Sequence, residues 1–293
     1  MGCVKSLRGK NPGGLPQKEI RKIIKNALRE DIGKGDLTTR LTIPRGRRTQ
    51  AKLTAKDNFL LCGILLAKEV FKTVDPGLKF HIAAKEGGFV RKNDTLALVS
   101  GKASSILTAE RTALNLVALL SGIATKTSRF AEKIKPFKSR ITDTRKTIPG
   151  IRLLEKYAVR TGGGHNHRMK LDEMILIKDN HLKIMGGYSR LPKAPAGCKV
   201  EIEVESPEEF RRALSFNPDI IMLDNMNIRQ IKEAIRIRDC RSGKNNSRPV
   251  WLEASGGINL ANVRKYASTG VEMISIGELT DSVESADISL EFI

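Results

Sequence analysis

The sequence predicts an α/β protein, and two patterns along the chain predict it. From about residue 140 onward, short apolar runs typical of strands alternate with stretches of helical periodicity. Before that point, strand patterns punctuated by Gly and Asn lie between two helical stretches. Alternating strands and helices indicate parallel strands, arranged as a barrel or as an open sheet. The length of 293 residues suits two domains, or one large barrel with an appendage.

The first half contains a tail, a helix, a group of strands and a second helix. Residues 1–14 are predicted to be a disordered basic tail, and the periodicity of 15–32 predicts a helix. Alternating residues from 45 to 63 predict strands, and 77–101 predicts short antiparallel strands joined by Gly and Asn turns. A long helix is expected over 106–134, with Gly122 as the point where it would break.

Six runs in the second half are predicted strands. They are RITDTR (140–145), EMILIK (173–178), KVEIEV (199–204), DIIMLD (219–224), VWLEAS (250–255) and EMISIG (272–277). Helices are expected at SPEEFRRALSF, with Ser206 as N-cap and Glu209 three residues on, and at NIRQIKEAIRIRD (227–239). The polar stretch 239–249 is predicted to be a surface loop.

Charged or small residues end nearly every predicted strand. These are Asp143, Arg145 and Lys146, then Lys178, Glu203, Asp224, Glu253, Ser255, Gly256, Gly257, Gly277 and Glu278. In (β/α) barrels the active site is built at the carboxyl ends of the strands, so a polar site is predicted there. Glu201, Glu203 and Glu205 share one strand face, which requires cationic partners or a bound cation. The alternative is a purely structural network of ion pairs.

Composition narrows the function classes. Lys and Arg number 52 against 32 Asp and Glu, a net charge of +20 that attracts polyanions or phosphorylated metabolites. Nucleic-acid binding is disfavoured because aromatic residues make up only 4% and no RNA-binding motif or helix-turn-helix is recognisable. No apolar run approaches the roughly 18 residues of a membrane span. The four cysteines lack metal-site spacing, which favours a reducing, cytoplasmic location.

Several motifs in order resemble one family. DTRKTIPGIRLLEKYAVRTGGGHNHRMKLDEMILIKDNHL (143–182) closely resembles quinolinate phosphoribosyltransferases. The stretches EVESPEEF, IIMLDNM, LEASGGI and SIGELT follow the same order as in that family, as do REDIGKGDLTT and TAERTALNLVALLSGIAT in the first half. The resemblance covers nearly everything from about residue 15 onward.

The resemblance implies a fold and an activity. The expected fold is an N-terminal α/β sandwich domain over 15–113 and an incomplete (β/α) barrel of the type II phosphoribosyltransferase kind over 114–281. Residues 282–293 would return to the first domain. The implied enzyme transfers phosphoribosyl from phosphoribosyl pyrophosphate to quinolinate with decarboxylation, giving nicotinate mononucleotide, CO₂ and pyrophosphate for NAD biosynthesis. Family members assemble as dimers or larger homo-oligomers, and partners other than small-molecule substrates, such as nucleic acid or membrane, are not expected.

The resemblance also implies site residues. The quinolinate carboxylates would be held by Arg145, His167 and Arg168, with Arg111 supplied by the neighbouring subunit. Guanidinium groups suit this task because their planar donors match a carboxylate. The implied catalytic residues are Lys146, Lys178, Glu203 and Asp224, of which Glu203 and Asp224 would hold Mg²⁺, partly through substrate. The sugar phosphate would lie at Ser255, Gly256, Gly257 and Gly277.

A zinc site is another interpretation of the stretch GGGHNHR (162–168). It is disfavoured because no spaced cysteine or HExxH partner accompanies the two histidines. The three glycines are expected to let the backbone turn tightly and approach the substrate.

One departure from the family pattern is LTDS (279–282), where Asp281 replaces a cation expected near the phosphate. A related protein of the same fold with another substrate is the remaining alternative, and no proton donor is identified beyond Lys146.

Overall fold

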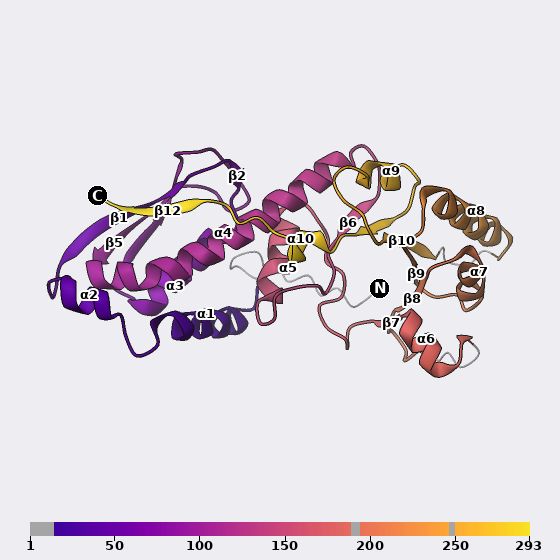
Figure 1. The fold of residues 1–293 in the computed structure, drawn as a ribbon, viewed down its shortest axis with the longest axis horizontal. Coiled ribbons are helices and arrows are strands. Elements are labelled where there is room, and N and C mark those ends of the chain that lie inside the picture. The colour runs from indigo at the N-terminus through magenta and orange to yellow at the C-terminus, as the bar shows by residue number, and fades with distance from the viewer. Residues whose placement is uncertain (1–14, 189–193, 246–249) are drawn as a thin grey trace. The chain divides into compact units, whose positions relative to one another are not determined.

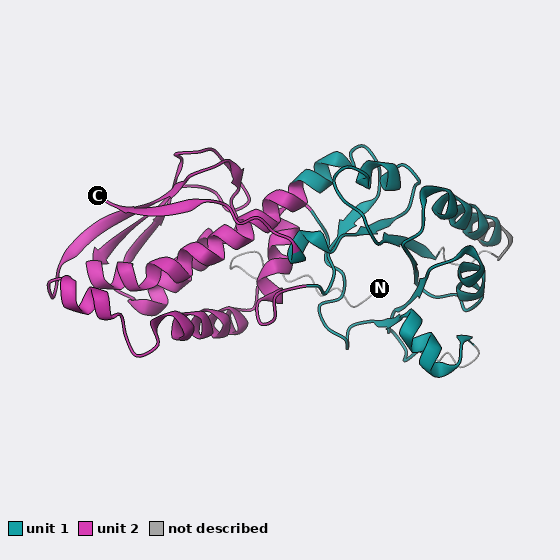
Figure 2. Ribbon diagram, in the orientation of Figure 1, with its two compact units in different colours: residues 1–5, 129–146, 164–281 teal, residues 6–128, 147–163, 282–293 magenta. Residues whose placement is uncertain are grey.

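The computed structural model describes residues 15–188, 194–245 and 250–293, and the predicted tail over 1–14 lies outside them. The described chain divides into two compact units (Figure 2). Unit 2 holds residues 15–128, 147–163 and 282–293, and unit 1 holds the rest. The division lies at 128/129, inside a helix that also contains the boundary predicted at 113/114.

Unit 2 is built on an antiparallel sheet with strand order β12-β1-β5-β3. These strands are β1 (Arg48–Ala55), β3 (Lys79–Ile82), β5 (Thr95–Lys102) and β12 (Ile288–Phe292), and a separate pair consists of β2 (Phe59–Leu60) and β4 (Phe89–Val90). The helices are α1 (Gln17–Ile32), α2 (Leu37–Thr42), α3 (Ile64–Val74), most of α4 (Ala103–Lys133) and α5 (Arg152–Thr161).

The sequence patterns explain the helices of this unit. Helix α1 buries Ile20, Ile24 and Leu28, whose spacing of four places them on one face. Helix α2 is N-capped by Asp36, whose carboxylate accepts a 2.9 Å hydrogen bond from the backbone N–H of Thr39. The sheet and the helices therefore form two layers around an apolar core (Figure 1).

Helix α4 is continuous, so the predicted break at Gly122 is wrong. A Cβ at Gly122 would lie 2.2 Å from the backbone oxygen of Glu284, so this glycine permits close packing instead of bending the helix. By length and composition alone α4 could cross a membrane, with a mean hydropathy of 1.3 in its most apolar window. However, 56% of that window is buried inside the protein, as in the core helix of a globular domain.

Unit 1 contains a six-stranded parallel sheet of order β6-β11-β10-β9-β8-β7. Its strands are β6 (Arg140–Thr142), β7 (Ile175–Ile177), β8 (Val200–Val204), β9 (Ile220–Asp224), β10 (Trp251–Ser255) and β11 (Met273–Ser275). Its helices are α6 (Asp179–Met185), α7 (Pro207–Ser215), α8 (Ile228–Asn245), α9 (Val263–Ala267) and α10 (Glu278–Asp281). All six predicted strands are confirmed.

Two details of unit 1 differ from the prediction. Helix α8 continues to Asn245, so the loop predicted from residue 239 is wrong over its first seven positions. The short helix α6 was not predicted, because its polar sequence DNHLKIM lacks an apolar face. Helices α7, α8 and α9 lie on the outer side of the curved sheet (Figure 1). The expected α/β class, with a sheet-and-helix unit and a barrel-like parallel unit, is confirmed.

Candidate active site

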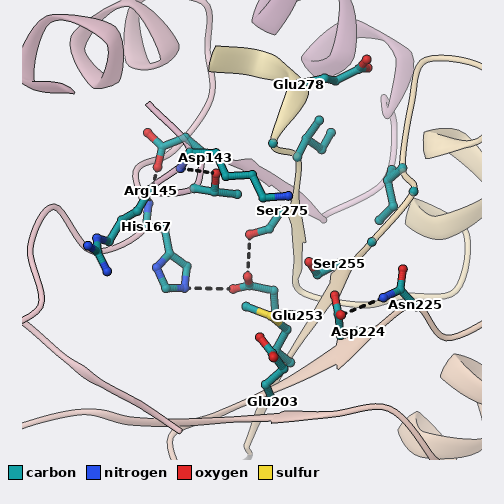
Figure 3. A pocket seen from close by; sticks show the side chains of 18 of the residues that line it. Asp143, Arg145, His167, Glu203, Asp224, Asn225, Glu253, Ser255, Ser275 and Glu278 are labelled. Atoms are coloured by element: carbon teal, nitrogen blue, oxygen red, sulfur yellow. Dashed lines mark hydrogen bonds and ion pairs between the residues drawn. The ribbon is translucent and has the colours of Figure 1, made fainter. Parts of the chain in front are cut away.

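A cavity of about 830 Å³ lies at the carboxyl ends of the parallel strands of unit 1 (Figure 3). The structure brings most of the predicted site residues together around it. They are Arg145, Lys146, His167, Arg168, Lys178, Glu203, Asp224, Ser255, Gly256, Gly257 and Gly277. Arg111 is not among the lining residues: it is exposed on α4 in unit 2. Its predicted role at a neighbouring subunit's site stays a prediction.

The segment that carries His167 and Arg168 is hydrogen-bonded to the edge of the sheet. The backbone N–H of His165 donates to the carbonyl of Ile141 at 2.8 Å, and the N–H of Asp143 donates to the carbonyl of His165 at 3.1 Å. The fully buried carboxylate of Asp143 accepts the Asn166 side-chain N–H at 2.5 Å and the His167 backbone N–H at 2.9 Å. Asp143 thus fixes this segment, a role that the sequence did not reveal.

The glycines before this segment serve packing and backbone conformation. A Cβ at Gly162 would lie 2.4 Å from the carbonyl oxygen of Ala124 in α4, and Gly163 has a φ of +86°. Neither they nor Gly164 are among the described residues that line the cavity. The expected tight turn is present at Gly163, and the expected approach of these glycines to the substrate stays a prediction.

Two arginines come together on one side of the cavity. Burial, and next the positive charge of Arg145, lower the pKa of Arg168 from its ordinary value. The guanidinium of Arg168 also donates to the carbonyl of Met174 at 2.9 Å, which fixes its direction. Two nearby guanidinium groups repel each other unless an anion lies between them, so this side of the cavity is suited to a carboxylate or phosphate.

His167 has partners on both ring nitrogens. Its Nδ1 accepts the backbone N–H of Arg168 at 2.9 Å, so the ring proton belongs on Nε2. That Nε2 lies 2.9 Å from Glu201 and 3.6 Å from Glu253. The imidazole therefore connects the arginine segment to two carboxylates beneath the cavity.

Those two carboxylates form a buried cluster with His167 and Ser275. Glu201 and Glu253 have no exposed surface, and the hydroxyl of Ser275 lies 2.5 Å from Glu253 (Figure 3). Burial, and next the charge of Glu201, raise the pKa of Glu253 to about 8. Glu253 was noticed in the sequence only as a strand end, and its partner Glu201 only as one of an alternating row.

Two further acids stand at the ends of neighbouring strands. Glu203, on β8, forms an ion pair with Lys178, and Asp224, at the end of β9, accepts the side-chain N–H of Asn225 at 2.8 Å. Both acids line the cavity. Carboxylate oxygens open to a cavity are the ligands that Mg²⁺ prefers when it also binds substrate oxygens, so these two residues fit a magnesium ion.

Glycines line the other side of the cavity. Gly256 and Gly257 follow β10 with φ values of +91° and +60°, and a Cβ at Gly256 would lie 2.2 Å from the side-chain oxygen of Asn225. A Cβ at Gly277 would lie 2.9 Å from the Asp281 carboxylate and 3.6 Å from the Lys146 ammonium. Backbone can approach a ligand closely at these positions, as a phosphate site requires.

Comparison with known proteins identifies consistent relatives. Residues 36–121 match the family model described as "Quinolinate phosphoribosyl transferase, N-terminal domain", and residues 123–291 match its C-terminal domain. The chain is 41% identical over 278 residues to a probable nicotinate-nucleotide pyrophosphorylase [carboxylating] of Methanocaldococcus jannaschii, covering 93% of this chain and 96% of the relative. A carboxylating nicotinate-nucleotide pyrophosphorylase of Mycobacterium leprae is 39% identical, covering 92% and 96%.

Solved structures agree with these sequence matches. The nicotinate-nucleotide pyrophosphorylase of Francisella tularensis superposes with a TM-score of 0.87 at 36% identity, covering 95% of this chain and 98% of that one. A protein from Ehrlichia chaffeensis of the same description gives a TM-score of 0.86 at 38% identity, covering 93% and 98%. The similarity thus extends over both compact units.

Proposed function

The chain belongs to the quinolinate phosphoribosyltransferase family, and from this we propose that the cavity of unit 1 performs the family's reaction. The enzyme transfers phosphoribosyl from phosphoribosyl pyrophosphate to quinolinate with decarboxylation, giving nicotinate mononucleotide. The observation that carries this proposal is the gathering of Arg145, Arg168 and Lys178 with Glu203 and Asp224 around one cavity. A cavity of this composition offers cationic groups to the acceptor and carboxylates to the sugar and metal.

Quinolinate recognition follows from the arginine side of the cavity. Quinolinate carries two adjacent carboxylates on a pyridine ring, so it needs convergent cationic donors. Arg145 and Arg168 supply them, and His167 holds the backbone of Arg168 in place through its Nδ1. Lys146 adds positive charge from the same loop. Orienting the ring in this way also directs its nitrogen toward the sugar.

The phosphoribosyl donor takes the glycine side. Backbone at Gly256, Gly257 and Gly277 can approach the 5′-phosphate closely, and Ser255 adds a hydroxyl. Glu203 and Asp224 line the cavity and would hold Mg²⁺ together with substrate oxygens. Such an ion would supply charge compensation for the pyrophosphate leaving group. A cation at Glu203 has to share that carboxylate with Lys178.

The chain's own residues act by positioning and by charge. As the C–O bond to pyrophosphate breaks, positive charge develops at the anomeric carbon, and the carboxylate of Glu203 stabilises it. The ring nitrogen supplies the electron pair for the new bond. Once that nitrogen is cationic, the bond to the adjacent carboxylate breaks, CO₂ leaves and the remaining pair on the ring carbon takes a proton. No side chain needs to attack covalently.

Assembly belongs to the same proposal. Arg111 is exposed on α4, and we propose that it reaches the cavity of a second copy in a homodimer or larger assembly. A matched pair of inactive variants tests this directly. Mixing Arg111→Ala chains with Arg145→Ala chains would restore part of the activity if each cavity draws Arg111 from its neighbour. Inactive mixtures would contradict the proposal.

The activity is tested by product formation. The full chain is incubated with quinolinate, phosphoribosyl pyrophosphate and Mg²⁺, and nicotinate mononucleotide and CO₂ are measured. A parallel reaction replaces quinolinate with nicotinate, which lacks the second carboxylate. We expect product only with quinolinate. If nicotinate is ribosylated and quinolinate is not, the arginine side of the cavity does not recognise two carboxylates.

A further inference from the structure

Without the Mg²⁺ proposed at Glu203 and Asp224 and the Arg111 proposed from a second copy, the charges around the cavity do not favour an anionic substrate when all its acids are ionised. Four cationic side chains line it: Arg145, Lys146, Arg168 and Lys178. Six carboxyl groups line it: Asp143, Glu203, Asp224, Glu253, Glu278 and Asp281. A quinolinate dianion adds two further negative charges to this set. A proton held on one of these acids would therefore favour binding.

Glu253 is the acid best placed to hold such a proton. It is fully buried, and full ionisation would put it beside a second buried carboxylate, that of Glu201 on β8. Isolated buried charges of like sign are costly, so one of two such carboxyls takes a proton. The other groups that face Glu253 are Ser275 on β11, Asp143 after β6 and His167. Of these, Asp143 repels a further negative charge.

His167 does not remove the need for this proton. Because its Nδ1 accepts the Arg168 N–H, the ring is neutral unless that hydrogen bond breaks. Its Nε2–H is directed at Glu201, at 2.9 Å, and is farther from Glu253, at 3.6 Å. Glu201 is thus the carboxylate that the imidazole stabilises as an anion, and Glu253 is stabilised when neutral.

Resting on the proposed function, we propose that Glu253 holds a proton beneath the cavity, and that this proton is required for binding the dianionic quinolinate. Glu253 is then a positioning residue for substrate charge at the wall of the cavity. Binding raises the proton affinity of Glu253 further, because a second anion arrives above it. Quinolinate binding therefore takes up a proton from solvent at pH values where free Glu253 is partly ionised.

The test measures that uptake in the full chain. Quinolinate is titrated calorimetrically without phosphoribosyl pyrophosphate at pH 8, in Tris and in HEPES, which differ in ionisation enthalpy. Wild type is expected to take up a measurable fraction of a proton, at most about one per site. Its affinity should fall between pH 7.5 and 8.5 as the protonated fraction falls, by up to about tenfold, the limit for one proton over one pH unit. Equal heats in the two buffers would overturn the proposal.

Two variants test whether the proton taken up from solvent binds to Glu253. Glu253→Gln, which mimics the neutral acid, should show no uptake and no fall in affinity over this pH range. The matched control is Glu205→Gln, an exposed carboxylate just beyond the same face of β8, which should keep both. Uptake that persists in Glu253→Gln would place the proton elsewhere and overturn the proposal. The two-buffer measurement on wild type decides even if Glu253→Gln does not fold.

A bound metal is the competing occupant of this cluster. The ligand atoms of His167, Glu201 and Glu253 lie within 4.8 Å of one another, a spacing that a divalent cation could bridge. Elemental analysis of chelator-treated protein separates the two possibilities. A stoichiometric metal that resists chelation and is absent from Glu253→Gln would overturn the proposal that Glu253 holds a proton. Metal-free protein that still binds quinolinate with proton uptake would support it. Absence of turnover in wild type would instead count against the proposed function.

Discussion

Arg145 is the side chain whose loss is expected to weaken quinolinate binding most. Replacing it with alanine leaves Arg168 as the one guanidinium group of the described chain that lines the cavity, and charged hydrogen bonds contribute roughly 1.5–3 kcal/mol each. Arg145→Ala should therefore raise the quinolinate KM by about 10–100-fold or abolish turnover. Steady-state kinetics with quinolinate varied will measure it.

The matched control for this change is Arg140→Ala. Arg140 starts β6, the strand that precedes Arg145, but its guanidinium lies over the Trp251 ring, 5.0 Å from the centroid, and Arg140 is not among the cavity-lining residues. Its removal also takes away one positive charge, yet the quinolinate KM should change less than about threefold. Similar effects of the two variants would mean that net charge, and not the contact, sets affinity.

Asp281 has a different consequence at the other side of the cavity. Its carboxylate and the Lys146 ammonium both approach Gly277, where the sugar phosphate is expected. Asp281→Asn removes a negative charge there, so the KM for phosphoribosyl pyrophosphate should fall by about two- to fivefold at low salt. The control Glu284→Gln removes an exposed carboxylate from unit 2 and should leave that KM unchanged. A rise in KM for Asp281→Asn would show that Asp281 positions Lys146 instead of opposing the phosphate.

Among single residues, the sequence predicted those site residues that stand at the end of a strand. It missed contacts between residues that are distant in the chain and meet only in the folded protein. Arg145, Lys178 and Asp224 were found because they follow apolar strand runs, and the structure places them around one cavity. The contact of Glu201 with His167 could not be found in that way. This contact depends on the curvature of the sheet and on the place where the segment after α5 lies against the sheet. The local pattern of apolar residues predicts neither of these.

At the scale of elements, strands were easier to predict than the limits of helices. Runs such as DIIMLD form strands because β-branched and apolar residues suit a sheet buried on both faces. A glycine in a helical pattern has two interpretations, a break or a close approach, and only the neighbour across the packing contact decides between them. For Gly122 that neighbour is Glu284, more than 160 positions away in the chain.

The same contact makes a prediction about stability. In an open helix, Gly→Ala stabilises by about 0.5–1 kcal/mol. At Gly122 the added Cβ would lie 2.2 Å from a backbone oxygen, so Gly122→Ala should destabilise by about 1–3 kcal/mol. Urea unfolding measures the change, and Ser104→Ala, exposed near the start of α4, is the control expected within about 0.5 kcal/mol of wild type. Stabilisation by Gly122→Ala would show that the backbone around Glu284 can move away from α4 at little cost in free energy.

At the scale of the whole molecule, the last strand completes the first sheet. Strand β12 pairs with β1 from Ala51↔Phe292 to Ala55↔Ile288, so it covers an edge of β1. Deleting residues 287–293 would expose that edge, and unpaired edges promote association between chains. The truncated protein should unfold at lower temperature and aggregate, as light scattering during heating will show.

A substitution at Phe292 separates the effect of losing the β12–β1 backbone pairing from the effect of losing a side chain. Phe292→Ser alters a side chain that is 43% exposed but keeps the strand in place. Its unfolding temperature should stay close to that of wild type, because exposed substitutions usually change stability by less than about 0.5 kcal/mol. If Phe292→Ser aggregates as readily as the truncation, the exposed aromatic ring and not the ladder protects this edge.

The parallel sheet of unit 1 has two ends, β6 and β7, and within the described residues these are its edge strands. The backbone that follows the three glycines lies along one of these ends, through the bridge between Thr142 and His165. The segment that carries His167 and Arg168 is therefore attached to the sheet by a few main-chain hydrogen bonds and by the Asp143 carboxylate, and it adds no strand to the sheet. Evolution could exchange that segment for another of different chemistry while every strand register stays as it is.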